Sequence, residues 1–176
     1  MEVYIMHSLS GDFDRTPNRR FEIHRARAII EGGPLRPQIK GIVTFERTPD
    51  GTEVCVSVTG LPKYQPAQRG SPPIGPHGFH IHEYGDKTVG NPEMPFQAAG
   101  SHWNPDDQPH GNHAGDFPVL FSQDGNSKMC FITNRFKPAD VVGRSVLIHE
   151  NPDDYRTQPA GNAGRRLAIG IIEADR

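Results

Sequence analysis

The sequence predicts an all-β protein whose short strands are joined by long loops. Glycine and proline are abundant, with 19 Gly and 17 Pro among 176 residues, and only 34% of the residues are hydrophobic. This composition disfavours a helical bundle and favours turn-rich connections between strands. The length suits one domain with its own hydrophobic core.

Apolar runs of strand length support this prediction. They cover residues 39–45, 54–58, 129–136, 145–149 and 167–172. In the second run, valines alternate with Cys55 and Ser57, which predicts that Cys55 faces away from the core. The sequences PDG at 49–51 and QDGNS at 123–127 are typical of turns between adjacent strands.

The chain is predicted to divide into an N-terminal extension, residues 1–23, and a main domain, residues 24–176. Two long irregular segments, 62–76 and 85–116, interrupt the strand pattern. Loops of this length in a compact domain are usually functional or disordered. The second contains most of the metal-ligand residue types, so we expect the functional site there.

Charge and hydropathy exclude several partners. A formal net charge of −2 provides no basic surface of the kind that nucleic acid or an acidic membrane selects. No stretch approaches the roughly 18 apolar residues of a membrane span, and the first residues lack the apolar core of a secretory signal. We expect a cytoplasmic protein with no nucleic-acid or membrane partner. A secreted or periplasmic location stays open if a signal peptide has been removed.

Histidines and one carboxylate are spaced as metal ligands. In GFHIHEYGD, His80 and His82 lie two residues apart on a strand-like run and therefore point to the same face. Such a pair alone is a weak signal, because surface histidines give the same pattern. The segment SHWNPDDQPHGNHAGD adds three histidines and a carboxylate, a set that can close a tetrahedral zinc site: His102, His110, His113 and Asp116. His149 ends a further strand-like run.

These motifs, together with SVLIHENPDD and GNAGRR, resemble the copper/zinc superoxide dismutase family over residues 25–173. The resemblance implies a Greek-key β-sandwich or barrel of about eight antiparallel strands with long metal-binding loops, an architecture known for this family. It also implies that superoxide is converted to dioxygen and hydrogen peroxide by copper redox cycling, with Cu(2+) and Zn(2+) as cofactors.

The resemblance further implies a role for each site residue. Copper is expected at His80, His82, His102 and His149, and zinc at His102, His110, His113 and Asp116. An all-nitrogen set suits Cu(II), whereas zinc has no redox chemistry and shapes the site. His102 is expected to bridge the metals and to exchange a proton during catalysis. Arg166 is expected to attract superoxide, and Asp153 to hydrogen-bond His80 and His110.

The sequence departs from the family in its cysteines, in its zinc loop and in the loop from Asp154 to Gly161, which is shorter than in the animal enzymes. The usual disulfide is expected to be absent, because Asn91 and Ile169 occupy the matching positions. Two reduced thiols are the simpler interpretation of Cys55 and Cys130, although a compensating bridge stays open. Only two residues separate His110 from His113, so the zinc loop is shortened.

Other charged residues and histidines near the motifs are expected to be ordinary. We interpret Arg165 as a solvated residue that could add to the local positive field, and Asp154 as a solvated loop acid. The remaining histidines have no ligand spacing and are interpreted as surface or loop residues: His7, His24 and His77.

Two other functions compete with the dismutase hypothesis. The chain could store or deliver copper or zinc without significant turnover, or it could be an interaction module that has lost its metals. The complete ligand set and Arg166 favour the enzyme. The oligomeric state stays open, with a homodimer as one option.

Overall fold

The computed structural model describes residues 22–71 and 73–175. Most of the extension predicted at 1–23, including His7, lies outside the described residues. The described strands are β1 (Arg25–Gly32), β2 (Lys40–Thr48), β3 (Gly51–Thr59), β4 (Phe79–His82), β5 (Ser127–Thr133), β6 (Ser145–His149) and β7 (Arg166–Ala174). One turn of 3-10 helix, η1 (Gln97–Ala99), and one turn of α-helix, α1 (Pro138–Val141), complete the elements of this part of the chain.

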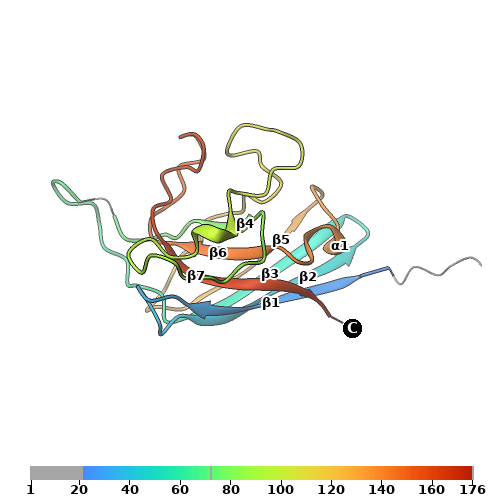
Figure 1. Ribbon diagram of the computed structural model, residues 1–176, viewed down its shortest axis with the longest axis horizontal. Helices are drawn as coiled ribbons and strands as arrows, with labels where there is room; N and C mark the ends of the chain where they lie inside the picture. Colours follow the sequence, from blue (N-terminus) through green and yellow to red (C-terminus); the bar gives the residue numbers. More distant parts are fainter. Residues whose placement is uncertain (1–21, 72, 176) are drawn as a thin grey trace, which may run out of the picture.

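The strands form one curled antiparallel sheet in the order β4-β6-β7-β1-β2-β3-β5 (Figure 1). The all-β prediction is confirmed, with seven strands among the described residues instead of about eight. The segment after Asp116 meets β4 through isolated bridges, His80 with Asp116 and His77 with Leu120. It does not form a continuous strand there, since Pro118 has no N–H to donate to a ladder.

Strand β4 separates the hydrophobic core from the loops that cover its outer face. Phe79 and Ile81 belong to the main core cluster, so the alternation of side chains along β4 sends His80 and His82 to the opposite face. Strand β6 repeats this division, with Val146 and Ile148 in the core. All residues of both strands are buried, because loops cover the face that the core does not.

Two loops lie side by side over this face, spanning approximately residues 100–118 and 150–165 (Figure 1). The backbone N–H of His110 donates to Gln158 Oε1 at 2.8 Å, and the backbone N–H of Val119 donates to the Tyr155 hydroxyl at 2.8 Å. These bonds join the loops, so ligand-type residues distant in sequence meet above β4 and β6.

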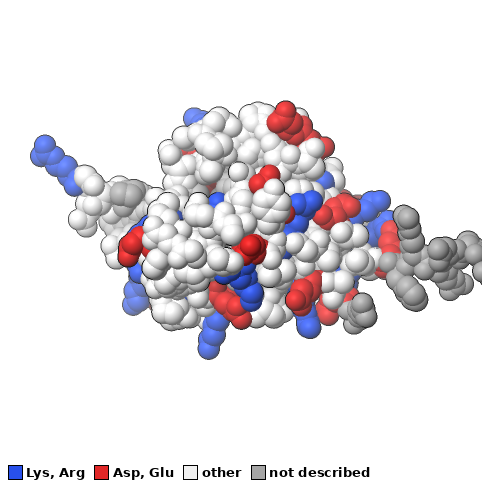
Figure 2. All heavy atoms as spheres, in the orientation of Figure 1, with Lys and Arg blue, Asp and Glu red and all other residues white. Residues whose placement is uncertain are grey.

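The surface agrees with the modest net charge. Figure 2 shows Lys and Arg intermixed with Asp and Glu on the face in view. Among the described residues, no helix is long and apolar enough to cross a bilayer.

The two cysteines form a disulfide, so the expectation of reduced thiols was wrong. Cys55 and Cys130 are register partners on the adjacent strands β3 and β5, with 4.1 Å between their Cα atoms. Directly opposed positions in an antiparallel pair carry side chains on the same face, which brings the sulfurs together. Cys55 alternates with the buried residues Val54 and Val56, which confirms that it faces away from the core.

We predict that replacing both Cys55 and Cys130 with serine lowers the free energy of unfolding by about 2–4 kcal/mol. The bridge joins positions 75 residues apart and therefore restricts the unfolded chain. Urea unfolding of the metal-free double variant and metal-free parent measures the difference. The metal content after reloading serves as the control and should match that of the parent. Identical unfolding midpoints would contradict the pairing.

Candidate metal centre

Strand β4 carries the candidate ligands His80 and His82. The segment that contains further candidate ligands pairs with the edge of β4 that β6 does not occupy. Residues on that edge form isolated bridges, His80 with Asp116 and His82 with His102. The N–H of Ile81 donates to Gly115 O at 2.9 Å, and Ile81 O accepts the N–H of Trp103 at 2.8 Å. The backbone therefore fixes the segment containing His102 and Asp116 against β4.

Four buried imidazoles converge above β4 and β6, and one ring nitrogen from each lies within 4.8 Å of the others: His80, His82, His102 and His149. We call these four residues the four-histidine group. The ring centroids of His80 and His102 are 3.9 Å apart, and those of His82 and His149 are 5.4 Å apart. The structure thus assembles the set that the sequence proposed for copper.

Hydrogen bonds determine which nitrogen of these rings is free. His82 Nδ1 lies 3.0 Å from Gly100 O, and His149 Nδ1 lies 3.3 Å from Gly164 O. A carbonyl only accepts, so each Nδ1 is the protonated donor and each Nε2 carries a lone pair. The two Nε2 atoms face each other at 3.2 Å. Opposed lone pairs repel, and a cation that both can coordinate removes that repulsion.

The other two histidines of the group agree with this pattern. His80 Nε2 donates to Asp153 Oδ2 at 2.7 Å, while its Nδ1 is buried without a partner. His102 Nδ1 lies 2.9 Å from Asp116 Oδ1, while its Nε2 is buried without a partner. Buried polar atoms without partners are costly. The free donor atoms therefore fit a cation with nitrogen ligands.

A second set shares His102 and consists of His102, His110, His113 and Asp116, again with one ligand atom from each within 4.8 Å of the others. We call it the His-Asp group. Asp116 lies at its centre, with its carboxylate oxygens 3.2 Å from His110 Nδ1 and 3.3 Å from His113 Nδ1. Three nitrogens and one carboxylate match a closed tetrahedral zinc site.

The shortened connection between His110 and His113 folds so that both rings enter this group. Gly111 has φ +91°, and a Cβ at this position would lie 2.4 Å from Tyr155 O, so only glycine fits. The N–H groups of Gly111 and His113 both donate to Asp116 Oδ2, at 2.9 and 3.1 Å. Asn112 does not share the positive φ.

Asp153 connects the two groups. Its buried carboxylate accepts from His80 Nε2 at 2.7 Å and from His110 Nε2 at 2.8 Å. A Cβ at Gly161 would fall 1.9 Å from Asp153 Oδ1, so a glycine is required beside it. Asp154 is exposed, as expected, and accepts from the Thr157 hydroxyl; this bond and backbone N–H donors lower the pKa of Asp154 to about 2.

The neighbouring residues Arg165 and Arg166 differ in whether a carboxylate compensates their charge. Arg166 is half-buried, and its guanidinium donates to Phe96 O and to Gly100 O. Burial lowers the pKa of Arg166. Arg165 forms a bidentate ion pair with Glu150, at 2.7 and 2.8 Å, so its charge is largely compensated. Arg166 is therefore the better source of a positive field beside the four-histidine group.

The expectation that His77 is a surface or loop histidine was wrong. His77 is fully buried, and its Nδ1 lies 2.9 Å from His149 O and 3.1 Å from Glu150 O. Burial lowers its pKa. Its position next to the GFHIH segment was the available signal in the sequence. His24 is exposed, as expected.

Protonation of His80, His82 and His149 is strongly disfavoured. Burial, reinforced by neighbouring imidazoles, lowers the pKa of His80 and of His82 well below the ordinary value, and burial lowers that of His149 to about 3. At Asp116, burial acts to raise the pKa, but the hydrogen bond from His102 and the nearby imidazoles lower it overall. Neutral imidazoles and an ionised carboxylate are the forms that bind metals.

Comparison with known proteins assigns the family. Residues 39–172 match the family model described as copper/zinc superoxide dismutase. A Deinococcus radiodurans protein named "Superoxide dismutase [Cu-Zn]" is 38% identical over 78% of this chain and 79% of the relative. A Legionella pneumophila protein of the same name is 36% identical over 82% of this chain and 84% of the relative.

A solved structure agrees with these relatives. The Cu/Zn superoxide dismutase from Brucella abortus superposes with a TM-score of 0.68 at 28% identity, covering 85% of this chain and 99% of the other. The chain therefore belongs to the copper/zinc superoxide dismutase family. It is an oxidoreductase of that family, with copper and zinc as its cofactors.

We predict that the metal-free protein loses stability as the pH falls below about 6.5. The unfolded chain protonates its histidines near that pH, whereas folded His149 resists protonation down to about 3. The unfolded state therefore binds more protons in this interval, and His149 alone contributes a loss approaching about 1.4 kcal/mol per pH unit. Above this interval its contribution is constant.

Urea unfolding at about pH 7.5 and about pH 5, both above the range where most carboxylates titrate, measures this loss. His149→Gln should reduce the difference between the two midpoints. A parent midpoint that stays constant or rises at the lower pH would contradict the prediction.

Proposed function

We propose that this chain converts superoxide to dioxygen and hydrogen peroxide at copper held by the four-histidine group, beside zinc held by the His-Asp group. The observation that carries this proposal is the set of ring nitrogens that converge in the four-histidine group. In His80, His82 and His149 the opposite nitrogen has a protein acceptor, and in His102 it faces the His-Asp group. When bound, copper supplies one-electron redox steps, and zinc supplies charge and shape without redox chemistry.

His102 is the residue through which we propose that a proton moves. Its Nδ1 faces Asp116, whereas its Nε2 faces the four-histidine group and has no protein partner. Nε2 can therefore take up a proton and release it toward the product. Two superoxide anions and two protons give one dioxygen and one hydrogen peroxide, so proton delivery is an obligatory part of the reaction.

Asp153 and Arg166 have supporting roles in this proposal. Asp153 fixes the orientation of His80 and His110 through their Nε2 atoms, as outer partners of metal ligands commonly do. Arg166 attracts superoxide to the four-histidine group. Its location supports this role, because Gly100 O accepts from both Arg166 Nη2 and His82 Nδ1.

We also propose that the chain forms a homodimer. Ile29 on β1 is 54% exposed, and Met94 and Val89 in the 85–101 loop are 47% and 39% exposed. The ion pair between Lys87 and Glu31 places this loop beside β1. Sedimentation velocity tests the proposal, and a monomer at micromolar concentration would contradict it.

The cellular compartment is a further proposal. The sequence analysis predicts a cytoplasmic protein, with a secreted or periplasmic location as the alternative. The Cys55–Cys130 disulfide supports the alternative, because structural disulfides persist mainly in oxidising compartments. Cell fractionation with thiol labelling of the protein tests it.

We predict that His149→Ala abolishes dismutase activity and leaves zinc bound. The change removes one nitrogen of the four-histidine group and no member of the His-Asp group. Activity should fall by at least the roughly 10–100-fold typical of losing even an outer partner of a metal ligand. Metal analysis and a dismutase assay on the same reconstituted sample measure both quantities.

His24→Ala, which changes an exposed histidine outside both groups, is the matched control. Undiminished activity in His149→Ala would contradict the copper assignment. A parent that binds both metals but shows no turnover would favour the storage or delivery function.

We predict that Arg166→Glu lowers the second-order rate constant for superoxide by more than about tenfold, and by more than Arg166→Lys does. Lysine retains the charge but cannot reproduce the forked contact with Phe96 O and Gly100 O. Pulse radiolysis at several ionic strengths measures the rates. Lys128→Glu reverses a charge on the exposed face of β5, at the opposite edge of the sheet, and is the control. Equal rates for the Lys and Glu variants of Arg166 would place it outside the substrate path.

A further inference from the structure

The loop between Gly85 and Ser101 has to keep its shape, because it supplies the carbonyls that hold Arg166. No disulfide fastens this loop, since the described cysteines pair with each other on β3 and β5. An ion pair between Lys87 and Glu31, 2.7 Å long, connects it to β1, but both side chains are exposed. Exposed pairs contribute little stability. Backbone bonds from the N–H of Tyr84 to Ala99 O and from the N–H of Glu83 to Ser101 O, both 3.0 Å long, hold the end of the loop next to β4, so the part that carries Phe96 needs a further anchor.

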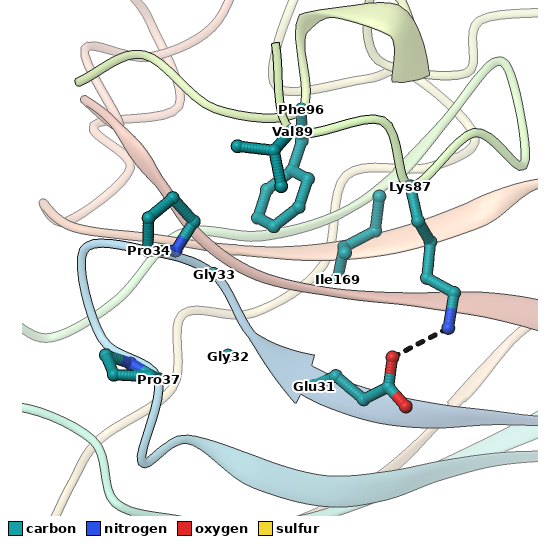
Figure 3. Close-up of a pocket in the computed structure, with 9 residues that line it drawn as sticks. All are labelled: Glu31, Gly32, Gly33, Pro34, Pro37, Lys87, Val89, Phe96 and Ile169. Atoms are coloured by element: carbon teal, nitrogen blue, oxygen red, sulfur yellow. Dashed lines mark hydrogen bonds and ion pairs between the residues drawn. The ribbon is translucent and has the colours of Figure 1, made fainter. Parts of the chain in front are cut away.

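The side chain of Phe96 provides that contact. It is 3% exposed and belongs to a small apolar cluster, separate from the main core, with Ala99, Leu147 and Ile169. Figure 3 shows its ring between the loop and the strands, pointing down toward Gly33 with Ile169 beside it. A Cβ at Gly33 would lie 2.5 Å from the ring, so the ring closely covers that glycine. The cluster joins the loop to β6 and β7.

The backbone of Phe96 has an unusual conformation. Its φ and ψ are 62° and 29°, in the left-handed region, which is rare for a bulky residue. Such conformations persist where surrounding contacts determine them, and they concentrate at functional sites. Here the ring enters the apolar cluster while the carbonyl oxygen accepts from Arg166 Nη1 and from the N–H of Ala99. The N–H of Phe96 donates to Val89 O at 3.0 Å.

The second carbonyl that holds Arg166 follows one short helical turn later. Gly100 O accepts from Arg166 Nη2 at 2.7 Å and from His82 Nδ1 at 3.0 Å. Helix η1 lies between Phe96 and Gly100, so the two carbonyls move as one unit. Anchoring the ring of Phe96 thus fixes the acceptor of one arm of the guanidinium directly and supports the acceptor of the other arm through η1.

We infer that Phe96 is the positioning residue for Arg166: its ring, packed on Ile169, replaces a covalent tie between the 85–101 loop and β7. The inference rests on the proposed function, because it gives Arg166 a role in attracting superoxide. Loss of the ring frees the part of the loop around Phe96, and the guanidinium then loses the fixed position of its Phe96 acceptor.

The test compares Phe96→Ala with Phe45→Ala in the copper- and zinc-loaded protein. Phe45 is fully buried in the main core, so the control also loses a buried ring. Phe96→Ala should lower the second-order rate constant for superoxide by about tenfold and weaken its dependence on ionic strength, with unchanged metal content. In an Arg166→Ala background, the same change should have almost no further effect, because both act through one interaction.

Hydrogen exchange in the metal-free protein supplies a readout independent of activity. Phe96→Ala should accelerate exchange of the amides in residues 86–101, whereas Phe45→Ala should not. Phe96→Leu and Phe45→Leu, which keep an apolar side chain, repeat the comparison if an alanine variant does not fold.

Three results would overturn the inference. Rates and exchange in the Phe96 variants could equal those of the parent, or the loss of rate could be equally large in the Arg166→Ala background. A rate unchanged by Arg166→Ala itself would instead refute the role of Arg166 in the proposed function, and the inference with it.

Discussion

Every member of the four-histidine group has one ring nitrogen next to a protein hydrogen-bond acceptor, and this constraint directs the other nitrogen toward a shared point. The acceptors are backbone carbonyls for His82 and His149, and carboxylates for His80 and His102. Burial keeps His80, His82 and His149 neutral by lowering their pKa values. Lone pairs directed at one another in a buried site favour a cation as their shared partner. The carboxylate of Asp153 maintains this arrangement by accepting from His80 and His110. Gly161 leaves the space that this carboxylate occupies.

Strand β4 supports this constraint because it alternates core residues with ligands. Phe79 and Ile81 pack in the core, so the core fixes the backbone positions from which His80 and His82 project. The free edge of β4 then binds the segment that contains His102 and Asp116. Arg166 has no comparable support from a strand on its loop side. Its acceptors, Phe96 O and Gly100 O, lie in the irregular 85–101 loop. Apolar packing of Phe96 holds this loop where a disulfide could have held it.

Part of this architecture could be predicted from the sequence, because some signals are local. Strand β6 has the predicted bounds, and Cys55 faces outward as the period of two requires. Strand β1 was not among the predicted runs, since its inward residues include Ala26 and Ala28, which give a weak apolar signal. The cysteine pairing was missed because it depends on the register of β3 against β5. The burial of His77 was missed because its partners are carbonyls near His149.

The sequence by itself determined the all-β class, the family resemblance and the residue types available for two metal sites. These follow from side-chain chemistry and from spacing along a strand, both of which are local. Only the tertiary structure decided which ring nitrogen of each histidine is free, how the short turn at Gly111 directs two imidazoles inward, and which carbonyls hold Arg166. Backbone acceptors are identical in every residue and carry no sequence signal. They are selected only when loops distant in sequence pack against the same face of the sheet.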